Sequence, residues 1–248
     1  MNKTKLFTCA LTGVMLAGLS QSVLSHTRLN VAKAAEGTRA INNLVISHSC
    51  NETSKTFGTS VVFPDGVDST ITVDDVPHEG TVLDFMTNYG NNAQLILDRA
   101  SFDEMDEKIV NGNVVGYWAG GGPGMQNHMN AMTTIRHTAA GIEPTSCAAE
   151  VQIKISIADI CQITAADGFS GEGVVNLWTH NDLGTPYDRV SETDDGPATF
   201  TITRDLVANP LPEDCGETGA IVVVKPSAAQ INRDMPIIWN GSQVWPQP

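Results

Sequence analysis

A strict alternation of apolar and polar residues from Val151 to Ile157 places the strongest constraint on the fold. Four β-branched residues occupy the odd positions of this stretch, and Gln152, Lys154 and Ser156 occupy the even ones. Because successive side chains of a strand point to opposite faces, this pattern predicts a half-buried strand. The same alternation recurs from Thr199 to Thr203. The chain is therefore expected to form sheets.

The rest of the chain supports an all-β fold. Further β-rich runs cover residues 41–47, 59–63, 69–73, 113–118 and 220–225, with turn sequences at 64–66 and 194–197. Short helices are expected at 81–89, 92–109 and 125–138, and the proline-rich end, 239–248, is expected to lie extended on the surface. We therefore predict an antiparallel β-sandwich-like single domain over residues 26–248, with long loops and a few short helices.

Residues 1–25 have the pattern of an export signal. Lys3 and Lys5 precede an apolar stretch at 6–19, and small residues lead to a cut before His26. No other segment is apolar enough to insert into a membrane. The product is expected to be secreted, either to the periplasm or to the outer surface of the cell, where it could lie peripherally on the outer membrane.

The charge of the chain excludes one class of partner. It carries 28 acidic and 14 basic residues, a formal net charge of −14, and the signal contains two lysines and no acids. Such a surface repels nucleic acid and anionic membranes, and it attracts cations. Nucleic-acid binding is therefore not expected.

Four cysteines follow the signal: Cys50, Cys147, Cys161 and Cys215. An even number in an oxidising compartment predicts two disulfides, for which three pairings are possible. The alternative is a thiolate metal site, but no two of these cysteines have the short Cys-x-x-Cys spacing that such sites usually show. Cys9 lies in the signal and is expected to be removed with it.

The step Trp178-Thr179-His180 is the first candidate metal site. It follows a strand-like approach at 174–177, so the indole and the imidazole are expected on one face. A metal ligand would then lie beside an oxidisable ring. The alternative is a partly buried tryptophan next to an exposed histidine.

A second candidate surrounds His128. It is flanked by Met125, Met129 and Met132 after a glycine-rich run at 120–124, and these sulfur and imidazole donors suit copper(I). In a helix the four side chains would form one stripe, and the alternative interpretation of that stripe is core packing.

The other histidines divide into one further candidate and three with ordinary roles. His26, as a new N-terminus, could offer its α-amine and imidazole to one copper ion. His48 is assigned a structural role, His78 a solvated one, and His137 could join His128 only through a returning loop. Acidic turns at 65–68 and 192–195 could hold structural calcium but lack the twelve-residue calcium-loop pattern. No hydrolase motif is present, so an enzyme is not expected.

The Trp178-x-His180 step resembles the surface copper-binding proteins of methane-oxidising bacteria, of the CorA and MopE C-terminal-domain type. That resemblance implies copper(I) held by two histidines near a tryptophan oxidised to kynurenine. Trp178 would be the kynurenine precursor and His180 one ligand. No histidine follows His180, so His128 is taken as the second ligand on its chemistry alone.

The N-terminal part also resembles the YcnI-type copper domain. The matching features are His26, the His-x-Cys step at 48–50, the Pro-Asp-Gly-Val turn at 64–67 and the Trp-Ala-Gly-Gly sequence at 118–121. This resemblance implies that His26 and Trp118 approach the metal, with Met125 and Met129 as further alternatives from the donor chemistry. Together, these features predict an exported copper-binding protein for copper acquisition or homeostasis at the cell surface. A copper oxidase built on His26 and a structural surface protein without a metal are the alternatives.

Overall fold

The computed structural model describes residues 26–90, 93–164, 168–169 and 171–247. The expected export signal and Cys9 lie outside the described residues. Within them, strands dominate, joined by one α-helix and two 3-10 helices. The elements are β1 (Arg28–Leu29), β2 (Lys33–Ala35), β3 (Arg39–Ile46), β4 (Lys55–Val62), β5 (Thr70–Val73), β6 (Val76–Pro77), η1 (Val82–Asp84), β7 (Met86–Thr87), β8 (Ala93–Leu95), β9 (Glu104–Val110), β10 (Asn113–Gln126), β11 (Ala131–Thr138), β12 (Gly141–Ile142), β13 (Ala148–Ile160), β14 (Val175–Trp178), β15 (Ala198–Thr203), η2 (Glu213–Cys215), β16 (Ala220–Lys225), α1 (Ala228–Asp234), β17 (Ile237–Trp239) and β18 (Ser242–Trp245).

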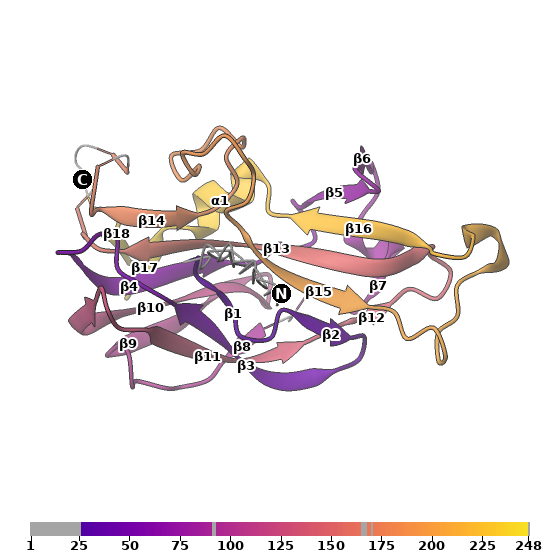
Figure 1. Ribbon diagram of the computed structural model, residues 1–248, viewed down its shortest axis with the longest axis horizontal. Helices are drawn as coiled ribbons and strands as arrows, with labels where there is room; N and C mark the ends of the chain where they lie inside the picture. The colour runs from indigo at the N-terminus through magenta and orange to yellow at the C-terminus, as the bar shows by residue number, and fades with distance from the viewer. Residues whose placement is uncertain (1–25, 91–92, 165–167, 170, 248) are drawn as a thin grey trace, which may run out of the picture.

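Two sheets face each other across the main core. A four-stranded sheet has the order β1-β3-β11-β8, and a ten-stranded sheet contains the path β6-β5-β16-β13-β4-β10-β9. In the larger sheet β14 and β15 also pair with β13, and β2 pairs with β15. Leu44 and Ile135 of the first sheet pack with Val61, Ile153 and other buried residues of the second. Figure 1 shows the two layers, and the predicted all-β, sandwich-like class is confirmed.

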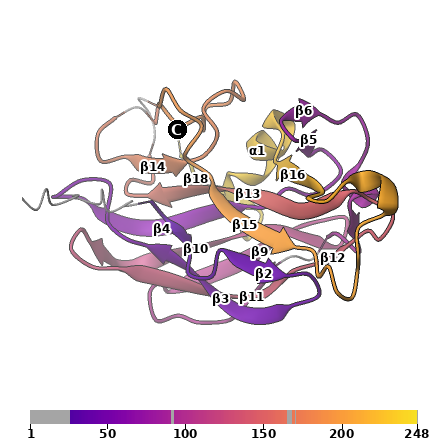
Figure 2. The same ribbon diagram turned by 45° about the vertical axis from the view of Figure 1, so that its right-hand side comes forward.

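A third layer covers the outer face of part of the large sheet. Ile231 and Met235 of the α1 region and Trp245 of β18 pack with Val62 and Ala158. In Figure 2, α1 lies on the opposite side of β13 from β3 and β11. The end of the chain was expected to lie extended on the surface, but β17 and β18 pair there, because Trp245 is 2 % exposed and anchors them in this layer.

The predicted alternation of buried and half-buried side chains is present in the first part of β13, before the third layer begins. Its apolar residues at odd positions are fully buried, and Gln152 and Lys154 are half-buried on the other face. From Ser156 onward both faces are buried, because the third layer covers the outer one. β13 pairs antiparallel with β4, β14 and β15 and parallel with β16.

Of the three predicted helices, that at 92–109 and that at 125–138 are wrong, and that at 81–89 is reduced to one 3-10 turn. Residues 81–89 form η1 and β7, the described part of 92–109 holds β8 and β9, and 125–138 is the end of β10, a turn and β11. Cross-strand pairing with β3 overrides the helical spacing, since β11 alternates between buried and outward positions. The observed helix, α1, begins after Ser227, whose hydroxyl accepts the backbone N–H of Gln230 at 3.1 Å. This Ser-x-x-Gln spacing is the sequence signal for its start.

Two disulfides form, as predicted. Cys50 pairs with Cys161, and Cys147 pairs with Cys215. The first joins the loop after β3 to the end of β13. Among the described residues, no helix has the length and apolar character needed to cross a membrane.

His137 predicts how stability depends on pH. It is 3 % exposed on β11 and stacks on Phe200, with ring centroids 3.6 Å apart. Burial lowers its pKa to about 4. The unfolded chain binds a proton here near pH 6.5 and the folded chain does not, so this residue destabilises the fold as pH falls from 6.5 toward 4.

We expect the wild-type protein to lose about 2 kcal/mol more stability than His137→Leu between pH 7 and pH 5. Denaturant unfolding of both proteins at the two pH values measures this difference. His128→Gln is the matched control, because His128 lies exposed in a turn, and it should keep the wild-type pH dependence. An equal loss in wild type and His137→Leu would contradict the prediction.

Candidate metal centre

Two histidines meet on the ring of Trp178. The His26 and Trp178 ring centroids are 4.6 Å apart, and those of His48 and Trp178 are 6.0 Å apart in an edge-on arrangement. The three residues come from the segment before β1, the loop after β3 and the end of β14. Long-range folding therefore assembles this cluster from parts of the chain more than 100 residues apart.

The His48 side chain has the hydrogen bonding of a metal ligand. Its Nδ1 lies 2.5 Å from the carbonyl oxygen of Ser49, so Nδ1 carries the proton and donates to that oxygen. The lone pair then lies on Nε2, which is buried and has no hydrogen-bond partner among the described residues. Metal-binding histidines usually donate their other ring N–H to a carbonyl or carboxylate in this way. An unpartnered buried nitrogen is otherwise costly.

The surroundings of His26 lower the pKa of its imidazole. Burial is the largest cause, and the positive charge of Arg189 lowers the pKa further, while Asp195 acts in the opposite direction. An unprotonated imidazole can donate its lone pair to a metal at neutral pH. Both imidazoles lie against the same ring, that of Trp178.

A buried carboxylate, Asp159 of β13, fixes the surroundings of both rings. Its oxygens accept hydrogen bonds from the Trp178 indole N–H at 2.7 Å, from the Thr59 hydroxyl at 2.9 Å and from the Thr27 hydroxyl. Thr27 is the residue after His26, so this bond holds the start of the described chain against β13. Burial raises the pKa of Asp159 to about 6, although the three hydrogen bonds oppose that shift.

Arg189 and the Cys50–Cys161 disulfide further restrain the cluster around Trp178. The Arg189 guanidinium lies 5.2 Å from the centre of the Trp178 ring and pairs with Asp195 at 3.5 Å. The Cys50–Cys161 disulfide ties the His48 loop to the end of β13, two residues beyond Asp159. The imidazoles are therefore held by a disulfide and by buried hydrogen bonds.

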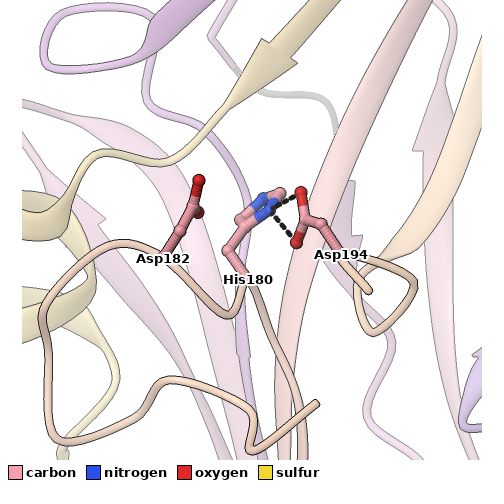
Figure 3. A group of neighbouring side chains, drawn as sticks. All are labelled: His180, Asp182 and Asp194. Carbon is pink, nitrogen blue, oxygen red and sulfur yellow. Dashed lines mark hydrogen bonds and ion pairs between the residues drawn. The ribbon is translucent and has the colours of Figure 1, made fainter. Parts of the chain in front are cut away.

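His180, the first predicted ligand, is not part of the cluster around Trp178. Its side chain is buried, with 1 % of the residue exposed. Figure 3 shows its imidazole between Asp182 and Asp194. Its Nδ1 donates to both carboxylate oxygens of Asp194 at 2.9 Å, and Lys225 donates to the same carboxylate at 3.0 Å. His180, Asp182 and Asp194 could together approach a cation, and Nε2 of His180 has no partner among the described residues.

The charges around His180 favour a structural role instead. The carboxylate of Asp194 already accepts hydrogen bonds from His180 and Lys225. Lys154 and Lys225 also line this pocket, so a further cation would be repelled by two ammonium groups. Burial is the first cause that lowers the pKa of His180, against the opposing effect of Asp194. The His180–Asp194 contact thus closes the 179–197 loop onto the outer face of the large sheet.

The structure does not bring the second predicted ligand to Trp178. His128 is exposed in the β10–β11 turn, and Met129 and Met132 are each 51 % exposed. Met125 packs instead in a small core cluster with Ile46 and Phe102. The glycine-rich run before it forms the part of β10 where the register with β4 shifts, and Gly121, Gly122 and Gly124 have positive φ there.

Trp118, the alternative from the N-terminal resemblance, lies in a different cluster from Trp178. It packs edge-on against Trp239, with ring centroids 6.2 Å apart, in the layer formed by α1 and β18. The acidic turns expected to suit calcium are paired with basic side chains: Arg233 bonds Asp65 at 2.8 Å and Asp68 at 3.3 Å. Arg233 also pairs with Asp234, so three carboxylates share its single positive charge.

Two functional candidates were missed at the level of sequence. His48 stands two residues before a cysteine, and its disulfide to β13 carries it to Trp178. Asp159 stands inside the apolar run that ends β13, and a carboxylate in such a run is a signal of a special role, since acids are almost never fully buried without partners.

No protein-family model and no curated protein matches the chain. One solved structure, of an uncharacterized protein from Nocardia farcinica described as having an immunoglobulin-like fold, aligns with 72 % of this chain and 98 % of its own at 16 % identity. The TM-score is 0.34, so this likeness carries no argument about function.

The disulfide gives a direct test of how the His48 ring is held. We expect diethyl pyrocarbonate to modify His48 slowly in the wild-type protein, because Nε2 is buried, and at least about tenfold faster in Cys50→Ser/Cys161→Ser. Peptide mass spectrometry at His48 measures the rate. The control, Cys147→Ser/Cys215→Ser, removes the other bridge and should leave His48 slow. Equal rates in all three proteins would contradict the expectation.

Asp159 predicts a second pH effect of opposite sign to that of His137. Its folded-state pKa is raised, so the folded chain binds a proton between about pH 4 and pH 6 that the unfolded chain does not, and this residue contributes less stability as pH rises through that range. The metal-free protein should therefore lose up to about 3 kcal/mol relative to Asp159→Asn between pH 4 and pH 7. Thermal unfolding in chelator measures the difference, with Asp103→Asn as the control because Asp103 is exposed. Parallel curves for wild type and Asp159→Asn would refute the prediction.

Proposed function

We propose that this chain is an exported copper-binding protein whose metal centre consists of His26 and His48 beside Trp178. The observation that carries the proposal is the buried, unpartnered Nε2 of His48, on the same tryptophan ring that the His26 imidazole contacts. Buried polar atoms are nearly always satisfied, so an orphaned ligand nitrogen favours a missing partner.

The donor set suits copper(I). Two neutral imidazoles can hold a singly charged, soft-to-borderline ion without a carboxylate or thiolate in the ligand set. Cleavage of an export signal before His26 would add the α-amine as a third nitrogen. This arrangement keeps the two-histidine and tryptophan chemistry of the methanotroph surface proteins, but it replaces His180 and His128 by His26 and His48.

Trp178 extends the resemblance. Its ring contacts both proposed ligands, so it is the residue exposed to oxidation by copper chemistry at this centre. We propose it as the kynurenine precursor, with dioxygen as the oxidant that cleaves the indole C2–C3 bond and with hydrolysis then releasing the formyl carbon as formate. Its indole N–H is held by Asp159, which fixes the ring against the metal position.

The surface charge supports capture as the role of the centre. An excess of 14 negative charges raises the local concentration of cations around the protein. The proposed role is therefore copper acquisition or homeostasis outside the cytoplasm, by binding and without a catalytic step.

The test is copper(I) affinity by competition with a chromogenic copper(I) chelator, on protein secreted by an exporting host. We expect one equivalent of copper to bind, and His26→Gln or His48→Gln to weaken it by more than about 100-fold, because even outer partners of ligands contribute 10–100-fold. His128→Gln is the control and should bind as wild type. Intact-peptide mass spectrometry of the same sample reads the state of Trp178.

Three outcomes count against the proposal. Wild-type protein that binds no copper would end it. Loss of copper binding in His128→Gln, with binding retained in His48→Gln, would favour the ligands predicted from the sequence, His180 and His128. Retained affinity in both single variants would show that copper binds elsewhere.

A further inference from the structure

We propose that Arg189 makes this centre selective for a singly charged metal ion over doubly charged ones. The inference deepens the proposed function and rests on it. It concerns a residue that touches the ring of Trp178 and carries a fixed positive charge beside the proposed ligands.

The geometry places the charge of Arg189 firmly. Its backbone N–H donates to the carbonyl oxygen of His180 at 3.0 Å, and its side chain is only one-fifth exposed. The guanidinium carbon lies 5.2 Å from the centre of the Trp178 ring, which in turn lies 4.6 Å from the His26 ring. A guanidinium remains protonated at any physiological pH, so this charge is permanent.

The nearby carboxylates do not cancel it. Asp195 pairs with Arg189 at 3.5 Å, but its side chain is more than half exposed, so solvent screens its charge more strongly than that of the mostly buried Arg189. The two oxygens of Asp159 already accept three hydrogen bonds, from Trp178, Thr59 and Thr27.

The ligands themselves are neutral, so they give no charge preference. The repulsion energy from Arg189 is proportional to the charge of the ion, so it is twice as large for a divalent ion as for a monovalent one. For one unit charge several ångströms away in a partly screened site, this difference corresponds to a factor of about ten or more in relative affinity. Copper(I) is thereby favoured over copper(II) and zinc(II).

The closing experiment compares Zn²⁺ and Cu⁺, each added alone in competition with a chelator of known affinity, for four proteins. Arg189→Gln should raise the zinc-to-copper(I) affinity ratio about tenfold. Arg189→Lys keeps the positive charge and should leave the ratio near the wild-type value. Asp195→Asn removes the partly neutralising carboxylate and should lower the ratio.

The failures of the inference and of the proposed function are separable. A wild-type protein that binds no Cu⁺ overturns the proposed function. A wild-type protein that binds Cu⁺, with an unchanged ratio in Arg189→Gln and Asp195→Asn, overturns the role of Arg189 alone. If Arg189→Gln does not fold, as judged by its melting temperature, the other two variants decide the question. A lower ratio in Asp195→Asn with an unchanged ratio in Arg189→Lys supports the role of Arg189, and an unchanged ratio in Asp195→Asn overturns it.

Discussion

The hydrogen bonding of β13 is the constraint on which the rest of the molecule depends. This strand pairs with β15 and β16 along its first half and with β14 and β4 along its second, so it joins elements from both ends of the chain. Its inner side chains fill the main core, and its last residues carry Asp159 and lead to Cys161. Removing a segment paired with β13 would therefore disturb the layers and the His26–His48 cluster together.

The class of fold follows from local signals, and its details do not. Alternation at 151–157 and 199–203 predicts β13 and β15, because a two-residue period has no other simple explanation. The spacing of Met125, His128 and Met132 fits a helix equally well, yet β11 has a partner strand on each side that the sequence does not reveal. The burial of Trp245 depends likewise on a layer that only the folded chain creates.

For the site, sequence alone identifies the kinds of residue but not their partners. Trp178 and His26 belong to two separate resemblances, and the folded chain brings them into ring contact. His180 stands two residues after Trp178, but its imidazole bonds Asp194 in a different pocket. Both proposed histidines lie more than 100 residues before Trp178 in the sequence, and short motifs contain no information about contacts over such separations. The His48-x-Cys50 step places a histidine near a cysteine, but the disulfide of that cysteine with Cys161 is itself a long-range contact.

The separation of the tryptophans has a practical consequence for spectroscopy. Trp118, Trp239 and Trp245 line one groove on the outer side of the large sheet, whereas Trp178 belongs to the main core. When Trp178 is unmodified, the intrinsic fluorescence of the protein thus comes from two distinct places, one of them in contact with two imidazoles and a guanidinium. A Trp178→Phe protein would supply the spectrum of the groove alone, and subtraction would isolate a single indole as an optical report on events at one side of the sandwich.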